Sequence, residues 1–156
     1  MDPRHQLILD NLRRIVQAVR QSQAHFERTS GLTSAQALIL KLIAGNSGIS
    51  VGEIAERTLT HQSTVSEVIG RMEAKGLVTR TRGSDDARRR ELQLTKAGEI
   101  ALSHPVETIQ ETFITAMDRV PSEKLDCLAE GLESLVAAAG LGLEPAPMFM
   151  EDGVEA

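Results

Sequence analysis

Aromatic residues and cysteine are almost missing from this sequence. Among Phe, Trp and Tyr only Phe occurs, at three of the 156 positions, and Cys127 is the single cysteine. The scarcity of aromatic rings disfavours a protein that binds single-stranded nucleic acid by stacking. A lone cysteine cannot form an internal disulfide or supply a structural zinc cage.

Long apolar runs, a signal-peptide pattern and catalytic motifs are missing as well. No stretch approaches the ~20 apolar residues that a membrane span requires, and residues 1–5 lack a basic-then-apolar pattern. The glycines stand singly, without a phosphate-binding loop or a nucleophile elbow. The sequence therefore predicts a cytoplasmic protein without membrane contact, enzymatic activity or cofactor. A metal site is not expected either, because the histidines are scattered without ligand spacing: His5, His25, His61 and His104.

Charge is distributed unevenly along the chain. The formal net charge is −5, but residues 57–96 carry nine basic and five acidic side chains, whereas residues 97–156 carry two basic and twelve acidic ones. A basic block inside an acidic chain indicates a localised surface for a polyanion. The same numbers of basic and acidic residues are equally consistent with charged side chains that only solvate the faces of helices.

Two long apolar stripes at helical spacing flank the middle of the chain. One predicts a helix that ends at Ser30-Gly31, and the other a helix that opens at Pro121-Ser122. Their residues are Ile8, Leu12, Ile15, Val19 and Phe26 at one end, and Leu125, Leu128, Leu132, Leu135 and Ala139 at the other. A chain of this size cannot cover both stripes by itself, so we expect a second copy to cover them.

Capping signals predict three further helices. Thr33 with Gln36, and Ser50 with Glu53, match capping boxes that open helices ending near Ile43 and Thr58. Thr60 is expected to cap the next helix, which runs to Lys75-Gly76.

A β-hairpin and a second capped helix are predicted after Gly76. Residues 77–82 and 90–95 alternate in character around a turn at 83–86, which is typical of a hairpin. Thr95 is expected to cap a helix that runs to Met117 with a kink at Pro105. Residues 140–156 are interpreted as an acidic, mobile tail, in which residues 148–150 could dock on a neighbour.

Two short helices followed by a basic hairpin form a winged helix. The predicted fold class is mainly α with a small β-hairpin wing (α+β), in which a helix enters the major groove of duplex DNA and the hairpin reaches a minor groove. The side chains expected near base edges are Gln62, Ser63, Thr64 and Ser66. Those expected at phosphates or in the minor groove are Arg71, Arg80, Arg82, Arg88, Arg89 and Arg90. Each hydroxyl could instead serve capping or solvation, and Glu67 could accept from a cytosine or pair with Arg71.

Residues 48–98 resemble the MarR family of bacterial winged-helix regulators. The run Lys75-Gly76-Leu77-Val78 is similar to the end of the family's recognition-helix segment. Asp86-Ala87-Arg88, followed by Leu94-Thr95 and Gly98, resembles its wing signature. The likeness in helix order extends over residues 5–140. It implies a winged-helix lobe at 32–97 and a dimerisation region at 5–30 and 98–140, with residues 141–156 as the tail.

The resemblance also implies a function. It suggests a homodimeric regulator on a pseudo-palindromic operator in double-stranded DNA, a repressor rather than an activator, with Asp86 orienting Arg88 in the minor groove. A small phenolic or lipophilic effector is expected between the helical region and the winged helix. Candidate lining residues are His25, Arg28, Gln36 and Phe113, although solvation is the alternative for His25 and Arg28.

Two alternatives remain open from the sequence. Redox regulation through Cys127 is disfavoured because Glu123, Asp126 and Glu130 lie close in sequence and oppose the reactive thiolate. A winged-helix module that binds another protein is disfavoured by the arginine-rich hairpin.

Overall fold

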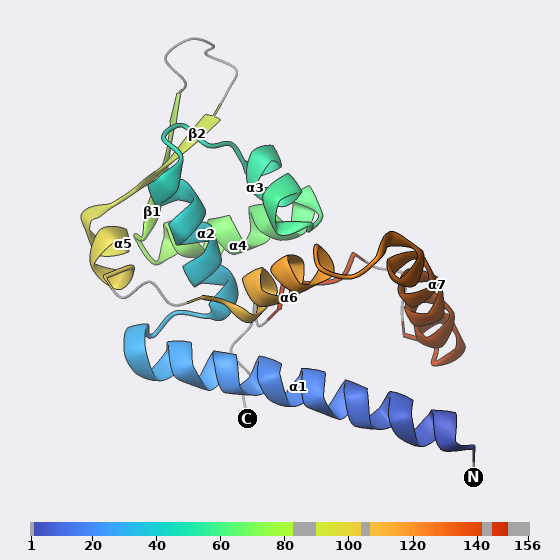
Figure 1. The fold of residues 1–156 in the computed structure, drawn as a ribbon. Coiled ribbons are helices and arrows are strands. Elements are labelled where there is room, and N and C mark those ends of the chain that lie inside the picture. Colours follow the sequence, from blue (N-terminus) through green and yellow to red (C-terminus); the bar gives the residue numbers. More distant parts are fainter. Residues whose placement is uncertain (1, 83–89, 104–106, 142–144, 150–156) are drawn as a thin grey trace.

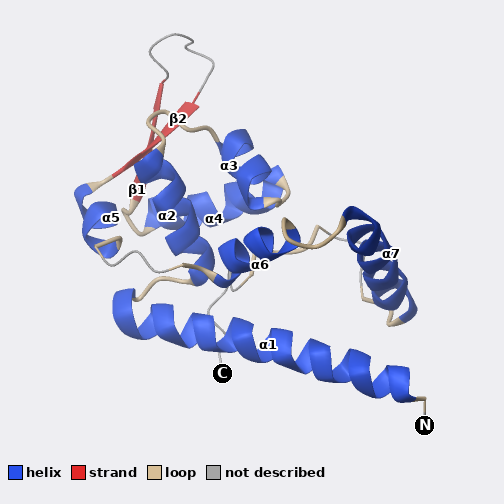
Figure 2. Ribbon diagram, in the orientation of Figure 1, coloured by secondary structure: helices blue, strands red, loops and turns tan. Residues whose placement is uncertain are grey.

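Seven helices and a two-stranded hairpin make up the described part of the chain. The computed structural model describes residues 2–82, 90–103, 107–141 and 145–149. The elements are α1 (Pro3–Ser30), α2 (Ser34–Gly45), α3 (Val51–Thr58), α4 (Gln62–Ala74), β1 (Val78–Arg82), β2 (Arg90–Leu94), α5 (Lys96–Ala101), α6 (Ile109–Met117) and α7 (Ser122–Ala138). Figure 2 shows the predominance of helix and confirms the predicted fold class.

The elements separate into a winged-helix lobe and flanking helices. In Figure 1, α2 to α5 and the hairpin gather together, α1 runs as a long rod along one side, and α7 stands at the far end beyond α6. The buried apolar side chains belong almost entirely to the lobe, where Ile39, Leu40, Ile54 and Ile69 are fully buried. The hydrophobic core therefore lies in the lobe.

Capping boxes start α2 and α3, as the sequence predicts. Thr33 Oγ1 accepts from the Gln36 amide at 3.2 Å, and Gln36 Oε1 accepts from the Thr33 amide at 3.3 Å. The reciprocal bonds of Ser50 and Glu53 measure 3.3 and 2.8 Å. Each box pairs helix-end amides that would otherwise lack a partner, and removing a cap costs about 1 kcal/mol.

The predicted cap of α4 is wrong. His61 occupies the N-cap position without a side-chain hydrogen bond, and α4 begins at Gln62. Thr60 Oγ1 instead donates to the Thr58 carbonyl at 3.0 Å. Thr60 therefore stabilises the turn between α3 and α4 rather than the first turn of α4.

The single kinked helix predicted from Thr95 to Met117 is also wrong. α5 ends at Ala101 and α6 begins at Ile109. Thr108 caps α6 with a box of its own, in which its hydroxyl accepts from the Glu111 amide at 3.3 Å and Glu111 Oε2 accepts from the Thr108 amide at 2.7 Å. Proline lacks an amide hydrogen, so a continuous helix through Pro105 would lose a backbone hydrogen bond, whereas a separate helix α6 begins with its own cap. Pro105 itself lies outside the described residues.

The base of the wing is locked to the helix-turn-helix. β1 and β2 pair antiparallel, with Val78 opposite Leu94. Thr95 Oγ1 donates to the Gly76 carbonyl at 2.5 Å and accepts from the Gly98 amide at 3.1 Å. A Cβ at position 98 would lie 2.1 Å from the Leu77 carbonyl oxygen, so only glycine fits. The Leu-Thr-x-x-Gly pattern thus joins the wing to α5.

The flanking helices and the tail differ from the lobe. Every residue of α7 is at least partly exposed, and α1 buries only Gln23 and Phe26. Within the described ranges, no helix is long and apolar enough to cross a membrane. Met148 is buried against the rest of the chain. Residues 142–144 and 150–156 lie outside the described part, so the predicted mobile tail stays a prediction.

Candidate nucleic-acid interface

The helix α4 presents a polar face away from the core. Its inward residues, Val65, Val68, Ile69 and Met72, are at most 1% exposed. The outward residues that the structure leaves exposed are Gln62, Ser63, Glu67, Gly70 and Arg71, with Ser66 partly exposed. The exposure of these side chains matches the predicted outward face at all positions but one, and their contacts with DNA stay predictions.

Thr64 is the exception. The sequence places it near base edges, but its side chain is 6% exposed. It precedes Val68 by one helical turn and therefore lies on the same side as the inward stripe. The polar face of α4 is narrower than predicted, and Thr64 belongs to the packing of the lobe.

Arg71 and Arg80 are both paired with glutamates of α4. The guanidinium of Arg71 lies 4.0 Å from the carboxylate of Glu67 on an exposed surface, as the i,i+4 spacing predicts. Arg80 Nε lies 3.1 Å from Glu73 Oε2, and the Arg80 side chain is only 25% exposed. An exposed pair contributes at most about 1 kcal/mol, so Arg71 can turn to a phosphate at small cost. Arg80 connects the wing to α4, and its predicted contact with DNA stays a prediction.

Of the remaining arginines, the structure describes the backbones of Arg82 and Arg90, at the outer end of the two strands. The backbones of Arg82 and Arg90 pair at that end, which Figure 1 shows projecting away from α1. Asp86, Arg88 and Arg89 lie outside the described residues. The structure therefore places the strands that carry the wing, and the predicted roles of its tip stay predictions.

Helix α6 holds the tight turn between α3 and α4. Gln110 is buried, and its Nε2 donates to the Thr58 carbonyl and, at 3.3 Å, to Thr60 Oγ1. Between these two residues Leu59 has φ +51°, a left-handed conformation that non-glycine residues rarely adopt. Sequence reasoning missed Gln110, because its partners lie about fifty positions away along the chain.

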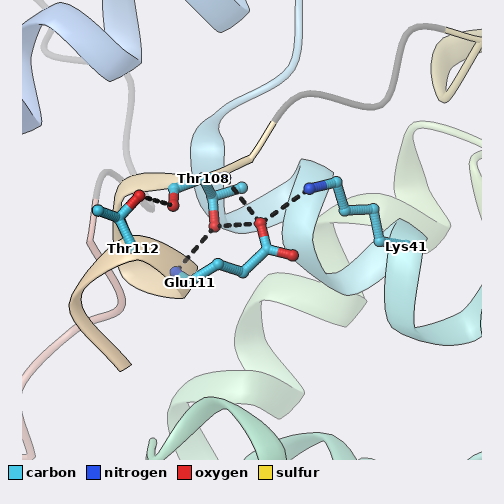
Figure 3. Close-up of polar contacts among 4 residues, drawn as sticks. All are labelled: Lys41, Thr108, Glu111 and Thr112. Carbon is cyan, nitrogen blue, oxygen red and sulfur yellow. Dashed lines mark hydrogen bonds and ion pairs between the residues drawn. The ribbon is translucent and has the colours of Figure 1, made fainter. Parts of the chain in front are cut away.

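A second polar contact joins α6 to α2. Figure 3 shows Glu111 between Lys41 and Thr108. Glu111 Oε2 lies 2.8 Å from Lys41 Nζ and accepts from the Thr108 hydroxyl at 2.8 Å. Burial by itself would raise the pKa of Glu111, but the hydrogen bonds from Lys41 and Thr108 outweigh burial and hold the pKa below its usual value. We call the contacts of Gln110 with Thr58 and Thr60, together with those of Glu111 with Lys41 and Thr108, the α6 brace.

The two predicted apolar stripes face each other across a groove. A cavity of about 440 Å³ lies between α1 and α7, lined by Ile8, Leu12 and Ile15 on one side and by Leu128, Leu132 and Leu135 on the other. Five of these six side chains are between 42% and 51% exposed in the single chain. Cys127 is exposed and lines the same cavity.

The four candidate effector residues take different places. His25 is half-buried, Arg28 is exposed with its Nε donating to the Ala24 carbonyl at 2.9 Å, and Gln36 is buried and occupied by its capping box. Phe113 is half-buried, and its ring lies 5.6 Å from the ring of Phe149. Gln36 thus has a structural role, and Phe113 contacts the C-terminal segment. Among the residues that the structure describes, no group of His, Cys, Asp and Glu could hold a metal ion.

Comparison with known proteins shows which family part of the chain resembles. Residues 30–89 match the model of the MarR family. Transcriptional regulator HosA of Escherichia coli is 34% identical over 86 residues, which cover 53% of this chain. The chain spans 64% of the length of that relative. The homoprotocatechuate degradative operon repressor of E. coli is 24% identical over 136 residues, covering 85% of this chain and 92% of the relative.

Solved structures agree with the fold described above. The transcriptional repressor CouR, bound to a 23-mer DNA duplex, is 25% identical, covers 90% of this chain and 96% of its own, and superposes with a TM-score of 0.56. The regulator BldR from Sulfolobus solfataricus superposes with a TM-score of 0.55 at 23% identity, covering 88% of this chain and 96% of its own. Residues 30–89 of this chain are thus similar to the MarR family, and the overall fold is that of MarR-type winged-helix regulators.

Proposed function

We propose that this chain is a sequence-specific DNA-binding regulator of transcription that acts as a homodimeric repressor and is released by a small effector. The observation that carries the proposal is the outward polar face of α4, held in one lobe with a wing whose strands end in arginines. A helix of this kind fits the major groove, and a hairpin reaches the neighbouring minor groove. The DNA duplex bound by CouR, a neighbour of the same fold, supports this interpretation.

The dimer is proposed from the apolar groove between α1 and α7. Half-exposed leucines and isoleucines on both helices leave a surface that a second copy would bury. A two-fold arrangement places the two α4 helices roughly 34–36 Å apart, one turn of the duplex, and predicts a pseudo-palindromic operator. The same surface includes Cys127, whose thiol would then be covered.

Effector release is proposed to act through the α6 brace. Gln110 and Glu111 connect α6 to the turn before α4 and to α2, so a displacement of α6 changes the position of the recognition helix. A ligand that binds more tightly to the chain with α6 displaced favours that conformation and lowers the affinity for DNA. The size of the effect is set by the difference between the ligand's affinities for the displaced and undisplaced conformations.

Selection of bound fragments from random duplex DNA, followed by fluorescence anisotropy at several salt concentrations, tests the proposal. We expect a palindrome with half-sites about one turn apart and a steep fall of affinity with salt. Arg71→Ala should reduce the salt slope, whereas Arg13→Ala, an exposed arginine paired with Asp10 on α1, should leave it unchanged. Weak binding without sequence preference in the selection would contradict the proposal and favour a protein-binding winged helix.

A further inference from the structure

The segment Pro145–Phe149 is docked on the chain's own helices. Met148 is 3% exposed and belongs to the buried apolar cluster that includes Phe26 of α1. The ring of Phe149 packs against that of Phe113 on α6, tilted by 57°. Figure 1 shows the segment, in red, beside α6. The C-terminal segment thus reaches the residue of α6 that the sequence nominates for effector binding.

The segment is held by apolar contacts. It has no regular secondary structure, Met148 is its one buried side chain, and Phe149 is 43% exposed. Within the described residues, no hydrogen bond or ion pair involves the segment. Removing it from its site therefore leaves no buried polar group unpaired there, and an apolar molecule could replace it.

The composition of the segment favours docking. Pro145 and Pro147 restrict the backbone on either side of Ala146, so less conformational entropy is lost when Met148 binds. The segment follows α7 after a few residues, and a short tether gives an effective concentration in the millimolar range. Such a segment occupies its site without strong contacts.

We propose that Phe113 and the apolar cluster around Met148 form a ligand site whose resident occupant is the pair Met148-Phe149. A small apolar or aromatic compound binds there by displacing these two side chains. The compound binds only to chains whose segment is undocked. Its apparent dissociation constant is therefore higher when a larger fraction of chains has the segment docked. This inference rests on the proposed effector response and adds that the effector competes with the chain's own C-terminal segment.

The site is placed to influence the recognition helix. Phe113 lies on the same short helix as Gln110 and Glu111, which hold the turn before α4 and the helix α2. When a ligand of another shape replaces Met148-Phe149, the packing around α6 therefore changes next to Gln110 and Glu111, the residues of the α6 brace.

Dye binding to the full-length chain tests the displacement. The probe is 1-anilinonaphthalene-8-sulfonate, an aromatic dye that fluoresces in apolar sites. We expect the double variant Met148→Ser, Phe149→Ser to bind the dye about tenfold more tightly than the unaltered chain, which corresponds to a docked fraction of about 90%. Leu141→Ser is the matched control, because Leu141 is an apolar residue after α7 that is 61% exposed, and it should leave dye affinity unchanged. A capped peptide with the sequence of residues 145–149 should displace the dye from the double variant.

A second measurement uses the unaltered chain, so that it does not depend on whether the double variant folds. With methyl-labelled methionine, the resonance of Met148, identified through Met148→Leu, should move to the position of an exposed methionine as the dye is added. Dye binding without movement of this resonance, or equal dye affinity of the double variant and the unaltered chain, would overturn the inference.

DNA affinity is measured on the same samples. Failure of the proposed function appears as absence of sequence-specific DNA binding in the unaltered chain, whatever the dye does. Failure of the present inference appears as dye binding that is insensitive to Met148 and Phe149 while DNA binding persists. The two failures are therefore distinguishable.

Discussion

The winged-helix lobe and the flanking helices α1 and α7 differ in how far their apolar residues are buried within the single chain. In the lobe, Ile39, Ile54 and Ile69 are fully buried by neighbouring elements of the same chain. In α1 and α7, apolar residues of the same kind remain about half exposed. The comparison indicates that the lobe gains its stability from its own core, whereas α1 and α7 leave apolar surface that the proposed dimer would bury.

Truncation in the core of the lobe should have the largest effect. Ile69→Ala removes a fully buried side chain and is expected to lower the free energy of unfolding by about 2–5 kcal/mol. Because the contacts are internal to the chain, the loss should be independent of protein concentration, as measured by urea denaturation over a hundredfold concentration range. A loss that varies with concentration would remove the distinction between the two regions.

A charge in the groove should break the association of chains. Leu132→Asp places a carboxylate on the apolar face of α7. We expect the dissociation constant of the proposed dimer to rise about 100-fold, which corresponds to about 2.7 kcal/mol. Sedimentation equilibrium measures the change. Ser134→Asp adds the same charge on the opposite side of α7 and should have little effect. Equal weakening by both variants would show that the stripe is not the interface.

Two glycines of the lobe should respond in opposite directions to the same substitution. Gly98→Ala forces a Cβ against the Leu77 carbonyl oxygen and is expected to cost about 1–3 kcal/mol. Gly70→Ala, on the exposed face of α4 with open space around it, should instead stabilise the chain by up to about 1 kcal/mol. Thermal unfolding of both variants checks the pair. Similar effects of the two would contradict the close contact of wing and α5.

The contribution of Glu111 should depend on pH with a defined sign. Its pKa is lower in the folded chain than in the unfolded chain, so the ion pair with Lys41 stabilises the fold above the unfolded pKa and loses this effect as pH falls through the folded pKa. We expect Glu111→Gln to cost about 1 kcal/mol at pH 7, after allowance for partial exposure, and almost nothing once the pH is below the folded pKa of Glu111. Urea denaturation across this pH range measures it, with Glu130→Gln on the exposed α7 as control. A cost that persists at low pH would assign Glu111 a role independent of its charge.

Local signals explain what could be predicted of the fold and the site. The capping boxes at Thr33 and Ser50 act within four residues, and their outcome matches the structure. The burial of Thr64 and the bonds of Gln110 could not be predicted in this way, because they depend on which elements pack together. The box at Thr108 was readable in the sequence, but the apolar spacing across Pro105 favoured a continuous helix.

The sequence by itself determined the order of elements up to α5, the inward stripe of α4 and the motif that joins the wing to α5. These features follow from side-chain periodicity and from hydrogen bonds between near neighbours. Only the tertiary structure decided that α6 braces the turn at Leu59 and that Met148 returns to the chain's apolar cluster. Such contacts join residues far apart in the chain, and packing of the whole molecule selects them rather than any local preference.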